Sequence, residues 1–199
     1  MTEPNIIIMN GASSSGKSTF GRSLKSSLSL PYFYLSSDQL VESGILPDLN
    51  RDLPDQANSW NLIRPKFFDG FHRCIKAWAD AGNLVIVEHV VEQPTWFSQL
   101  VDLLRNHSVL YIGVHCPVEE LDRRERARGN RTIGEGRSHL ADGIHTWSGY
   151  DLEINTFEQS IEENLQQVMA SIRSFARPNS IFYKELHKID KIRNLQREN

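Results

Sequence analysis

Short apolar runs recur along the chain at intervals that suit the strands of one sheet. Three of them are continuous and rich in β-branched residues, a pattern typical of parallel strands buried on both faces. A fourth run is aromatic, and a fifth alternates between polar and apolar residues. In chain order, the predicted strands are Ile6–Met9, Tyr32–Leu35, Leu84–Val87, Val109–Val114 and Asp151–Asn155.

Apolar residues at helical spacing fill the segments between these strands. Thr156 and Gln159 predict a capping box for one of these helices, Glu158–Phe175. Strands that alternate with helices imply a mostly parallel sheet covered on both faces, which is an α/β fold of three layers. The other predicted helices follow Gly16, span Trp60–Trp78 and Thr95–Asn106, begin at Pro117, and run from Ile181 to Leu195.

Composition narrows the class of protein. The 199 residues suit one compact domain, which we expect over residues 1–176, followed by a helical extension over 177–199. That extension either docks on the domain or a second copy, giving a homo-oligomer, or lies on the surface. A net charge of -3 gives no reason to expect nucleic-acid binding. With no signal peptide and no apolar run of membrane length, we expect a cytoplasmic protein without a membrane partner.

The candidate site is organised around a phosphate-binding loop between the first strand and its helix. Its sequence runs Gly11-Ala12-Ser13-Ser14-Ser15-Gly16-Lys17-Ser18. The glycines permit backbone N–H groups to approach phosphate oxygens, and the following helix N-terminus attracts the same anion. Lys17 adds positive charge at the β- and γ-phosphates, and the Ser18 hydroxyl is a ligand for Mg²⁺. A serine- and glycine-rich surface turn is the alternative, but the strand before and the helix after the motif disfavour it.

Two acidic residues directly follow strands, at the sheet edge where α/β proteins bind ligands. Asp38 follows the second strand and is either a functional carboxylate or a helix cap. Glu88 follows the third strand and either holds Mg²⁺ or orients substrate, or is an exposed strand-end acid. His89 is interpreted as an ordinary hydrogen-bonding residue.

Arginines crowd the helix after Pro117 and the segment beyond it, notably Arg124, Arg128, Arg131 and Arg137. Such a run is usually a solvated face. Here it leads into Gly129, Gly134 and Gly136, which suit a flexible lid that brings arginines to a transferring phosphoryl group. The irregular, proline-containing stretch Gly44–Ser59 is typical of a second lid or substrate loop.

The chain resembles the chloramphenicol phosphotransferase-like family, whose fold is that of nucleoside-monophosphate kinases. The resemblance rests on the loop motif, on Ser37-Asp38-Gln39-Leu40, and on the order of residues from Leu110 to Thr156, and it covers Asn5 to Phe175. It implies ATP-dependent phosphorylation of a hydroxyl group on a small molecule, with Asp38 as general base. Asn155 stands where the family has Asp, and Glu88-His89 replaces paired acids.

The resulting hypothesis assigns catalysis to Asp38, Lys17, Arg128 and Arg131, and metal binding to Ser18 and Glu88. The acceptor pocket is expected between Gly44–Trp60, Trp96 and Phe97. A zeta-toxin-like nucleotide-sugar kinase is the alternative within the enzyme class. A GTPase-type switch is disfavoured, because Glu88-His89-Val90-Val91 lacks its Asp-x-x-Gly motif. Predicted to bind ATP are Gly11, Ala12, Ser13, Ser14, Ser15, Gly16, Lys17, Ser18, Thr19 and Arg124.

Overall fold

The computed structural model describes residues 3–49, 59–128 and 133–197. Gly129, Arg131 and most of the Gly44–Ser59 stretch lie outside these ranges. Every predicted strand is present, close to its expected ends. The strands are β1 (Ile6–Asn10), β2 (Tyr32–Ser36), β3 (Leu84–His89), β4 (Val109–His115) and β5 (Leu152–Asn155).

The strands form one sheet in the order β2-β3-β1-β4-β5, and every neighbouring pair is parallel. The central strand β1 is therefore flanked by β3 and β4, and the chain order reverses at this point. In open α/β sheets, ligands bind just outside the carboxyl ends of the strands at such a switch point. The phosphate-binding loop follows β1 directly, so it lies there. The predicted three-layer α/β fold is confirmed.

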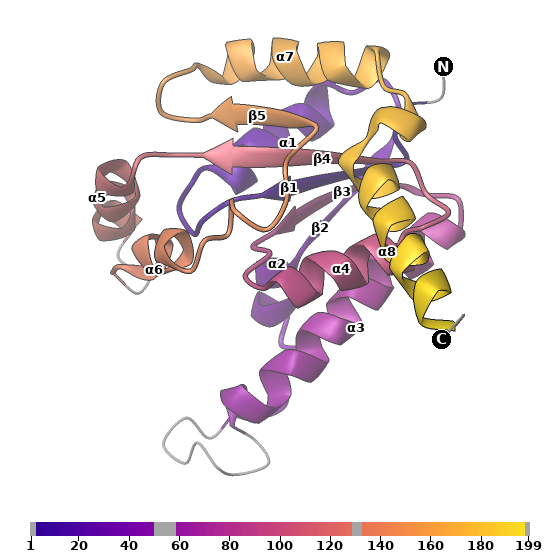
Figure 1. Ribbon diagram of the computed structural model, residues 1–199. Coiled ribbons are helices and arrows are strands. Elements are labelled where there is room, and N and C mark those ends of the chain that lie inside the picture. Colours follow the sequence, from indigo (N-terminus) through magenta and orange to yellow (C-terminus); the bar gives the residue numbers. More distant parts are fainter. Residues whose placement is uncertain (1–2, 50–58, 129–132, 198–199) are drawn as a thin grey trace.

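Helices cover both faces of the sheet (Figure 1). Alternate residues of β1 point to opposite faces, so Ile7 and Met9 pack under α1 and α7, and Ile6 and Ile8 pack under α3, α4 and α8. Among the described residues, no helix combines the length and the apolar character needed to cross a bilayer. The helices are α1 (Lys17–Ser27), α2 (Ser37–Glu42), α3 (Trp60–Asp80), α4 (Pro94–Leu103), α5 (Val118–Arg128), α6 (Glu135–Ala141), α7 (Ile161–Arg173), the 3₁₀ turn η1 (Arg177–Asn179) and α8 (Ile181–Arg197).

The C-terminal helix α8 packs against α4 and β4. Phe182 and Leu186 are buried in the same cluster as Phe97 and Tyr111. The Asp151 carboxylate accepts hydrogen bonds from the backbone N–H groups of Tyr111 (2.8 Å) and Ile181 (2.7 Å), which joins the start of α8 to the sheet. The predicted boundary between a domain over residues 1–176 and an extension over residues 177–199 stays a prediction. So does the formation of a homo-oligomer.

One prediction about a helix start is wrong, and one alternative is excluded. The helix α7 begins at Ile161, and its capping box is made by Ser160 and Glu163 instead of Thr156 and Gln159. Thr156 is engaged in a tertiary hydrogen bond with the phosphate-binding loop. The helix α2 has Ser36 at its N-cap position, without a side-chain cap bond, and Asp38 lies inside its first turn. The helix-cap alternative for Asp38 is therefore excluded.

Candidate active site

The phosphate-binding loop has the backbone that its glycines predict. Gly16 has φ of 91° and Ser14 has φ of 62°, so both lie in the left-handed region. A Cβ atom on Gly11 would lie 2.4 Å from the carbonyl oxygen of Val114, a contact that only glycine avoids. The loop thus curls tightly between the ends of β1 and β4, with α1 beginning at Lys17.

Lys17 lies within this curl and is 5% exposed. Its ammonium group donates hydrogen bonds to the carbonyl oxygens of Gly11 (2.9 Å) and Ala12 (2.7 Å). These two carbonyl groups help to hold the ammonium group inside the loop. A phosphate oxygen is a stronger partner for an ammonium group than a carbonyl oxygen is, because the resulting hydrogen bond is charge-assisted on both sides.

The Glu88 carboxylate is held on both of its oxygens. The Ser18 hydroxyl donates to Oε1 at 2.6 Å, and the Tyr34 hydroxyl donates to Oε2 at 2.6 Å. Burial, and next the Glu88 charge, raises the pKa of Tyr34 well above its usual range, so its hydroxyl stays a donor. Gly21 makes room for this ring, because a Cβ atom there would lie 2.7 Å from Tyr34 Cε2. Glu88 is 8% exposed, which excludes the alternative of an exposed strand-end acid.

Strand register brings these residues together. Glu88 on β3 is paired with Met9 on β1 and with Ser36 on β2. The carboxyl ends of the three strands therefore lie side by side, with His89 ending β3 and with the loop and Asp38 following β1 and β2. Asp38, Lys17, Ser18, Glu88 and Arg128 all line one cavity of about 310 Å³, which we call the main cavity.

The far wall of the main cavity is aromatic. Trp60, Phe67 and Phe68 line it, together with Arg64 and Glu92. The Arg64 guanidinium lies over the rings of Phe68 (5.1 Å to the centroid) and Trp96 (5.0 Å) and forms an ion pair with Glu92. Trp96 therefore supports the wall from behind.

Neither predicted wall residue on α4 lines the main cavity: Trp96 lies behind Phe68 and Arg64, and Phe97 is placed elsewhere. Phe97 does not line the main cavity and packs in the core against Tyr111 and Phe182. The expectation for Phe97 is wrong, because α4 points its Phe97 face toward the sheet and α8.

His89 belongs to a buried chain of hydrogen bonds under this wall. His89 Nε2 lies 2.9 Å from His72 Nε2, and His72 Nδ1 lies 2.8 Å from the carbonyl oxygen of Gln99. The Gln99 amide group donates to Asp69, so its oxygen faces His72. His72 therefore donates from Nδ1 and accepts from His89. Burial lowers the pKa of both histidines, and that of His89 falls well below its usual value.

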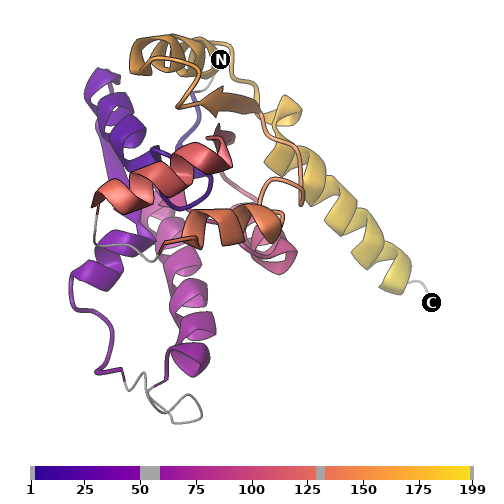
Figure 2. The ribbon, with the colours of Figure 1, turned by 90° about the vertical axis from the view of Figure 1, so that its left-hand side faces the viewer.

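The helix α6 lies beside α5 (Figure 2) and contacts the phosphate-binding loop. The Ser13 N–H donates to Nδ1 of His139 (3.1 Å), and the Ser13 hydroxyl donates to Glu135 (3.1 Å). The backbone N–H groups of Gly134 and Gly136 both donate to the Glu125 carboxylate at 2.7 Å. The described part of the predicted lid is thus a short helix anchored to α5.

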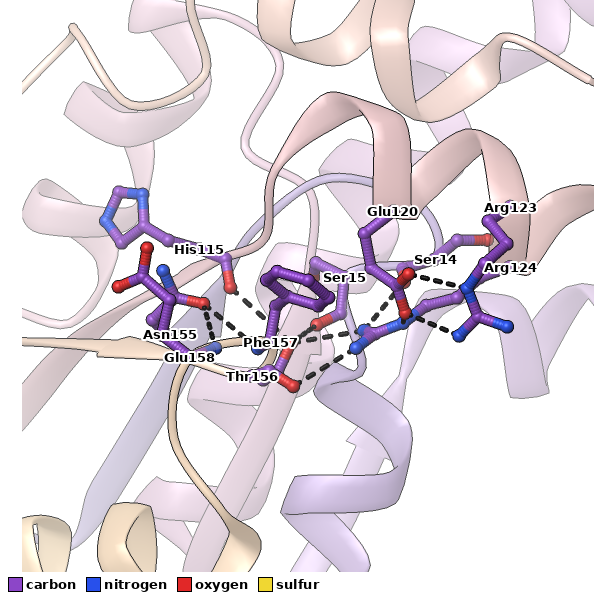
Figure 3. Close-up of polar contacts among 10 residues, drawn as sticks. All are labelled: Ser14, Ser15, His115, Glu120, Arg123, Arg124, Asn155, Thr156, Phe157 and Glu158. Atoms are coloured by element: carbon purple, nitrogen blue, oxygen red, sulfur yellow. Dashed lines mark hydrogen bonds and ion pairs between the residues drawn. The ribbon is translucent and has the colours of Figure 1, made fainter.

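Arginine side chains of α5 divide between structural pairs and the site. Arg124 donates to Glu120 (2.7 Å), to the hydroxyl and carbonyl oxygens of Thr156 (3.1 Å each) and to the Ser14 carbonyl oxygen (3.4 Å) (Figure 3). Arg124 and Arg128 line a second cavity of about 220 Å³ beside Gly16 and Thr156. Arg137 instead pairs with Asp122, and Arg131 lies outside the described residues.

Several site residues carry no local sequence signal. Tyr34, Arg64, Glu92, His139 and Thr156 reach the site through contacts between distant segments. Tyr34 is the exception, because it lies two residues before the end of β2, a strand that leads into the site. Its position in the sequence therefore indicated that it could lie near the site.

The parallel sheet with a phosphate-binding loop at its switch point defines the fold as that of a P-loop protein. Two solved structures share this fold. One is the APS kinase CysC of Mycobacterium tuberculosis in complex with AMPPNP and APS (TM-score 0.60, 19% identity, 87% of this chain and 99% of the other). The other is shikimate kinase from Acinetobacter baumannii in complex with shikimate (TM-score 0.58, 17% identity, 87% and 94%).

Sequence comparison gives the family. The model of the chloramphenicol phosphotransferase-like proteins matches residues 4–173, and the chain belongs to this family. A protein of Mycobacterium tuberculosis strain H37Rv, described as a candidate O-phosphotransferase, is 26% identical over 195 residues, covering 89% of this chain and 86% of that protein. The protein is therefore a phosphotransferase of the kinase type that acts on hydroxyl groups of small molecules.

Proposed function

We propose that the protein transfers the γ-phosphoryl group of ATP to a hydroxyl group of a small molecule, with Asp38 as the base. One observation carries this proposal: Asp38 lines the same main cavity as Lys17, Ser18 and Glu88. A base, a phosphate-binding cation and two oxygen ligands for a metal therefore share one space. Phosphoryl transfer mainly requires positioning and charge neutralisation, and these groups provide both.

ATP is assigned to the loop Gly11–Thr19 and the second cavity. The loop offers backbone N–H groups and the N-terminus of α1 to the phosphates. Lys17 would exchange the carbonyl oxygens of Gly11 and Ala12 for phosphate oxygens. The second cavity, which adjoins Gly16, would take the base and ribose beside Arg124 and Arg128. The APS kinase that shares this fold was solved with AMPPNP, which supports a nucleotide as donor.

The residues present fit Mg²⁺. Mg²⁺ prefers oxygen ligands and commonly takes one or two from protein, with the others from phosphates and water. Ser18 and Glu88 provide a hydroxyl and a carboxylate that already lie 2.6 Å apart. When bound, the ion neutralises charge on the phosphate oxygens. Tyr34 holds the Glu88 carboxylate from its other side.

Asp38 would act on the acceptor hydroxyl. As the bond from the hydroxyl oxygen to the γ-phosphorus forms, the O–H bond breaks and the Asp38 carboxylate receives the proton. The bond between the γ-phosphorus and the bridging oxygen of ADP breaks, and ADP leaves with those electrons. In a loose transition state, orientation of the hydroxyl by Asp38 matters as much as the proton transfer. Arg128, and Arg131 by prediction, would neutralise the transferring group.

The acceptor would occupy the aromatic side of the main cavity. Trp60, Phe67 and Phe68 favour a compound with an apolar body. The charge of Arg64 is balanced by Glu92, so this wall offers no net charge to an ionic acceptor. The description of the family makes chloramphenicol the first compound to test, beside other hydroxylated antibiotics and metabolites.

The experiment is a screen for acceptor-dependent ADP release, followed by Asp38→Asn and Lys17→Ala. Asp38→Asn should leave ATP affinity unchanged and lower kcat by about two to four orders of magnitude, the range of a positioned base. Glu162→Gln is the matched control, because Glu162 is an exposed acid in the first turn of α7. If Asp38→Asn reduces transfer no more than Glu162→Gln does, Asp38 is not the base. Near-normal transfer by Lys17→Ala would exclude the loop as the phosphate site.

A further inference from the structure

Thr156 ties the loop after β5 to the phosphate-binding loop, across 141 positions of sequence. Its hydroxyl contacts the carbonyl oxygen of Ser15 at 2.5 Å, and Nη1 of Arg124 contacts the hydroxyl oxygen at 3.1 Å. Figure 3 shows Thr156 beside both partners, with Arg124 reaching it from α5.

The direction of these hydrogen bonds follows from their chemistry. A guanidinium group only donates, so Arg124 donates to the Thr156 oxygen. The Thr156 hydroxyl has two carbonyl acceptors, Ser15 at 2.5 Å and His115 at 3.5 Å, and its single proton is directed to the nearer one, Ser15. Arg124 also donates to the Ser14 carbonyl oxygen at 3.4 Å. Two consecutive carbonyl groups of the phosphate-binding loop are thus held from the side of α5 and β5.

Holding a carbonyl group also orients the next N–H group. In a trans peptide unit, the C=O and the following N–H point in opposite directions within one plane. A Ser15 carbonyl held by Thr156 therefore turns the Gly16 N–H away from Thr156, toward the inner side of the loop. Backbone N–H groups on that side are the donors that such loops offer to phosphate.

Thr156 is itself held in place. Its own N–H donates to the His115 carbonyl oxygen at 3.1 Å. The Asn155 side chain accepts hydrogen bonds from the N–H groups of Phe157 (3.0 Å) and Glu158 (3.1 Å), which closes a turn around it. Gly16 leaves the necessary space, because a Cβ atom there would lie 3.2 Å from the Thr156 hydroxyl. Backbone contacts on both sides of Thr156 therefore fix its position beside the loop.

We propose that Thr156 is a positioning residue, which acts through the Ser15 carbonyl group to present the loop N–H groups to the phosphates of the nucleotide. This inference rests on the proposed function, because it concerns the same nucleotide site. Because the Thr156 hydroxyl donates to the Ser15 carbonyl oxygen, the proposal assigns it no direct contact with the phosphates. Its effect should therefore fall on binding of the polyphosphate, whatever base the ligand carries.

The test compares Thr156→Val, which keeps the shape and removes the hydroxyl, with Thr156→Ser, which keeps the hydroxyl. Binding of AMPPNP and of inorganic tripolyphosphate, each with Mg²⁺, is measured by calorimetry. Thr156→Val should weaken both ligands about tenfold, equivalent to about 1.4 kcal/mol, and Thr156→Ser should restore affinity to within about twofold of the wild type. If Thr156→Val does not fold by thermal melting, Thr156→Ala is compared with Thr156→Ser in its place.

Each other outcome overturns the inference. A loss confined to AMPPNP would mean that Thr156 acts in the second cavity, on the base or ribose. Equal losses in Thr156→Val and Thr156→Ser would mean a packing role for the methyl group or backbone. Unchanged affinity in Thr156→Val would remove the role altogether. Failure of the wild type to bind AMPPNP, or full binding by Lys17→Ala, would instead contradict the proposed function.

Discussion

The hydroxyl group of Tyr34 is the best place to test how the site holds Glu88. Tyr34→Phe removes one hydrogen bond, the 2.6 Å contact to Oε2 of Glu88, and leaves the ring. A hydrogen bond to a charged group contributes about 1.5–3 kcal/mol. In a domain of this size, 1 kcal/mol corresponds to about 2–4 °C in melting temperature. The variant should therefore melt about 3–12 °C below the wild type.

The same strand offers a matched control. The Tyr32 hydroxyl donates to the Pro4 carbonyl oxygen, also at 2.6 Å. This acceptor is neutral, and Tyr32 is the first residue of β2, at the end of the strand away from the site. Burial raises the pKa of Tyr32 to about 12, so it too remains a donor. Tyr32→Phe should cost about 0.5–1.5 kcal/mol, the range for a neutral pair. It should leave catalysis unchanged.

The Mg²⁺ dependence of turnover should distinguish Tyr34→Phe from Tyr32→Phe more clearly than the melting temperature does. In Tyr34→Phe, the Glu88 carboxylate keeps only its bond from Ser18. We expect the Mg²⁺ concentration for half-maximal ATP turnover to rise about tenfold, which corresponds to about 1.4 kcal/mol. The assay is thermal melting together with a Mg²⁺ titration of turnover. Equal melting temperatures for the two variants, with an unchanged Mg²⁺ dependence in Tyr34→Phe, would refute the reasoning.

Two further predictions concern the supports of the site. Gly21→Ala places a Cβ atom 2.5 Å from the Met9 side chain and 2.8 Å from the Tyr34 hydroxyl. We therefore expect the free energy of unfolding, measured by chemical denaturation, to fall by about 1–3 kcal/mol. The control is Gly70→Ala, in open space on α3, which should be neutral or stabilising. Arg123, and next Arg124, lowers the pKa of Glu120 to about 2, so its stabilisation is present above the usual value of 4.5 and is lost as pH falls toward 2. Glu120→Gln should therefore have a lower melting temperature than the wild type at pH 7, and the difference should disappear as the pH falls from 4.5 to 2. A difference that does not change with pH would show that it does not arise from the ionised Glu120 carboxylate.

The sequence by itself determined the sheet and the centre of the site. Strand positions follow from local apolar runs, and the phosphate-binding loop is a contiguous motif whose backbone needs glycine at Gly11 and Gly16. The positions of Asp38 and Glu88 follow from one rule of parallel sheets, that all strands end at the same edge. These features depend on residues that are close together in the sequence, so they can be predicted from one sequence alone.

Only the tertiary structure decided which side chains hold that centre in place. Thr156 illustrates the limit: its spacing to Gln159 satisfies a capping box, but Ser160 and Glu163 satisfy one as well, and both pairs cannot start the same helix. The hydrogen bond from Thr156 to Ser15 selects between them, and it joins residues 141 positions apart. The contacts of Tyr34 with Glu88 and of Arg64 with Glu92 have the same origin. Pairs of this kind form where packed elements meet, and no local pattern of residue types records which elements will meet.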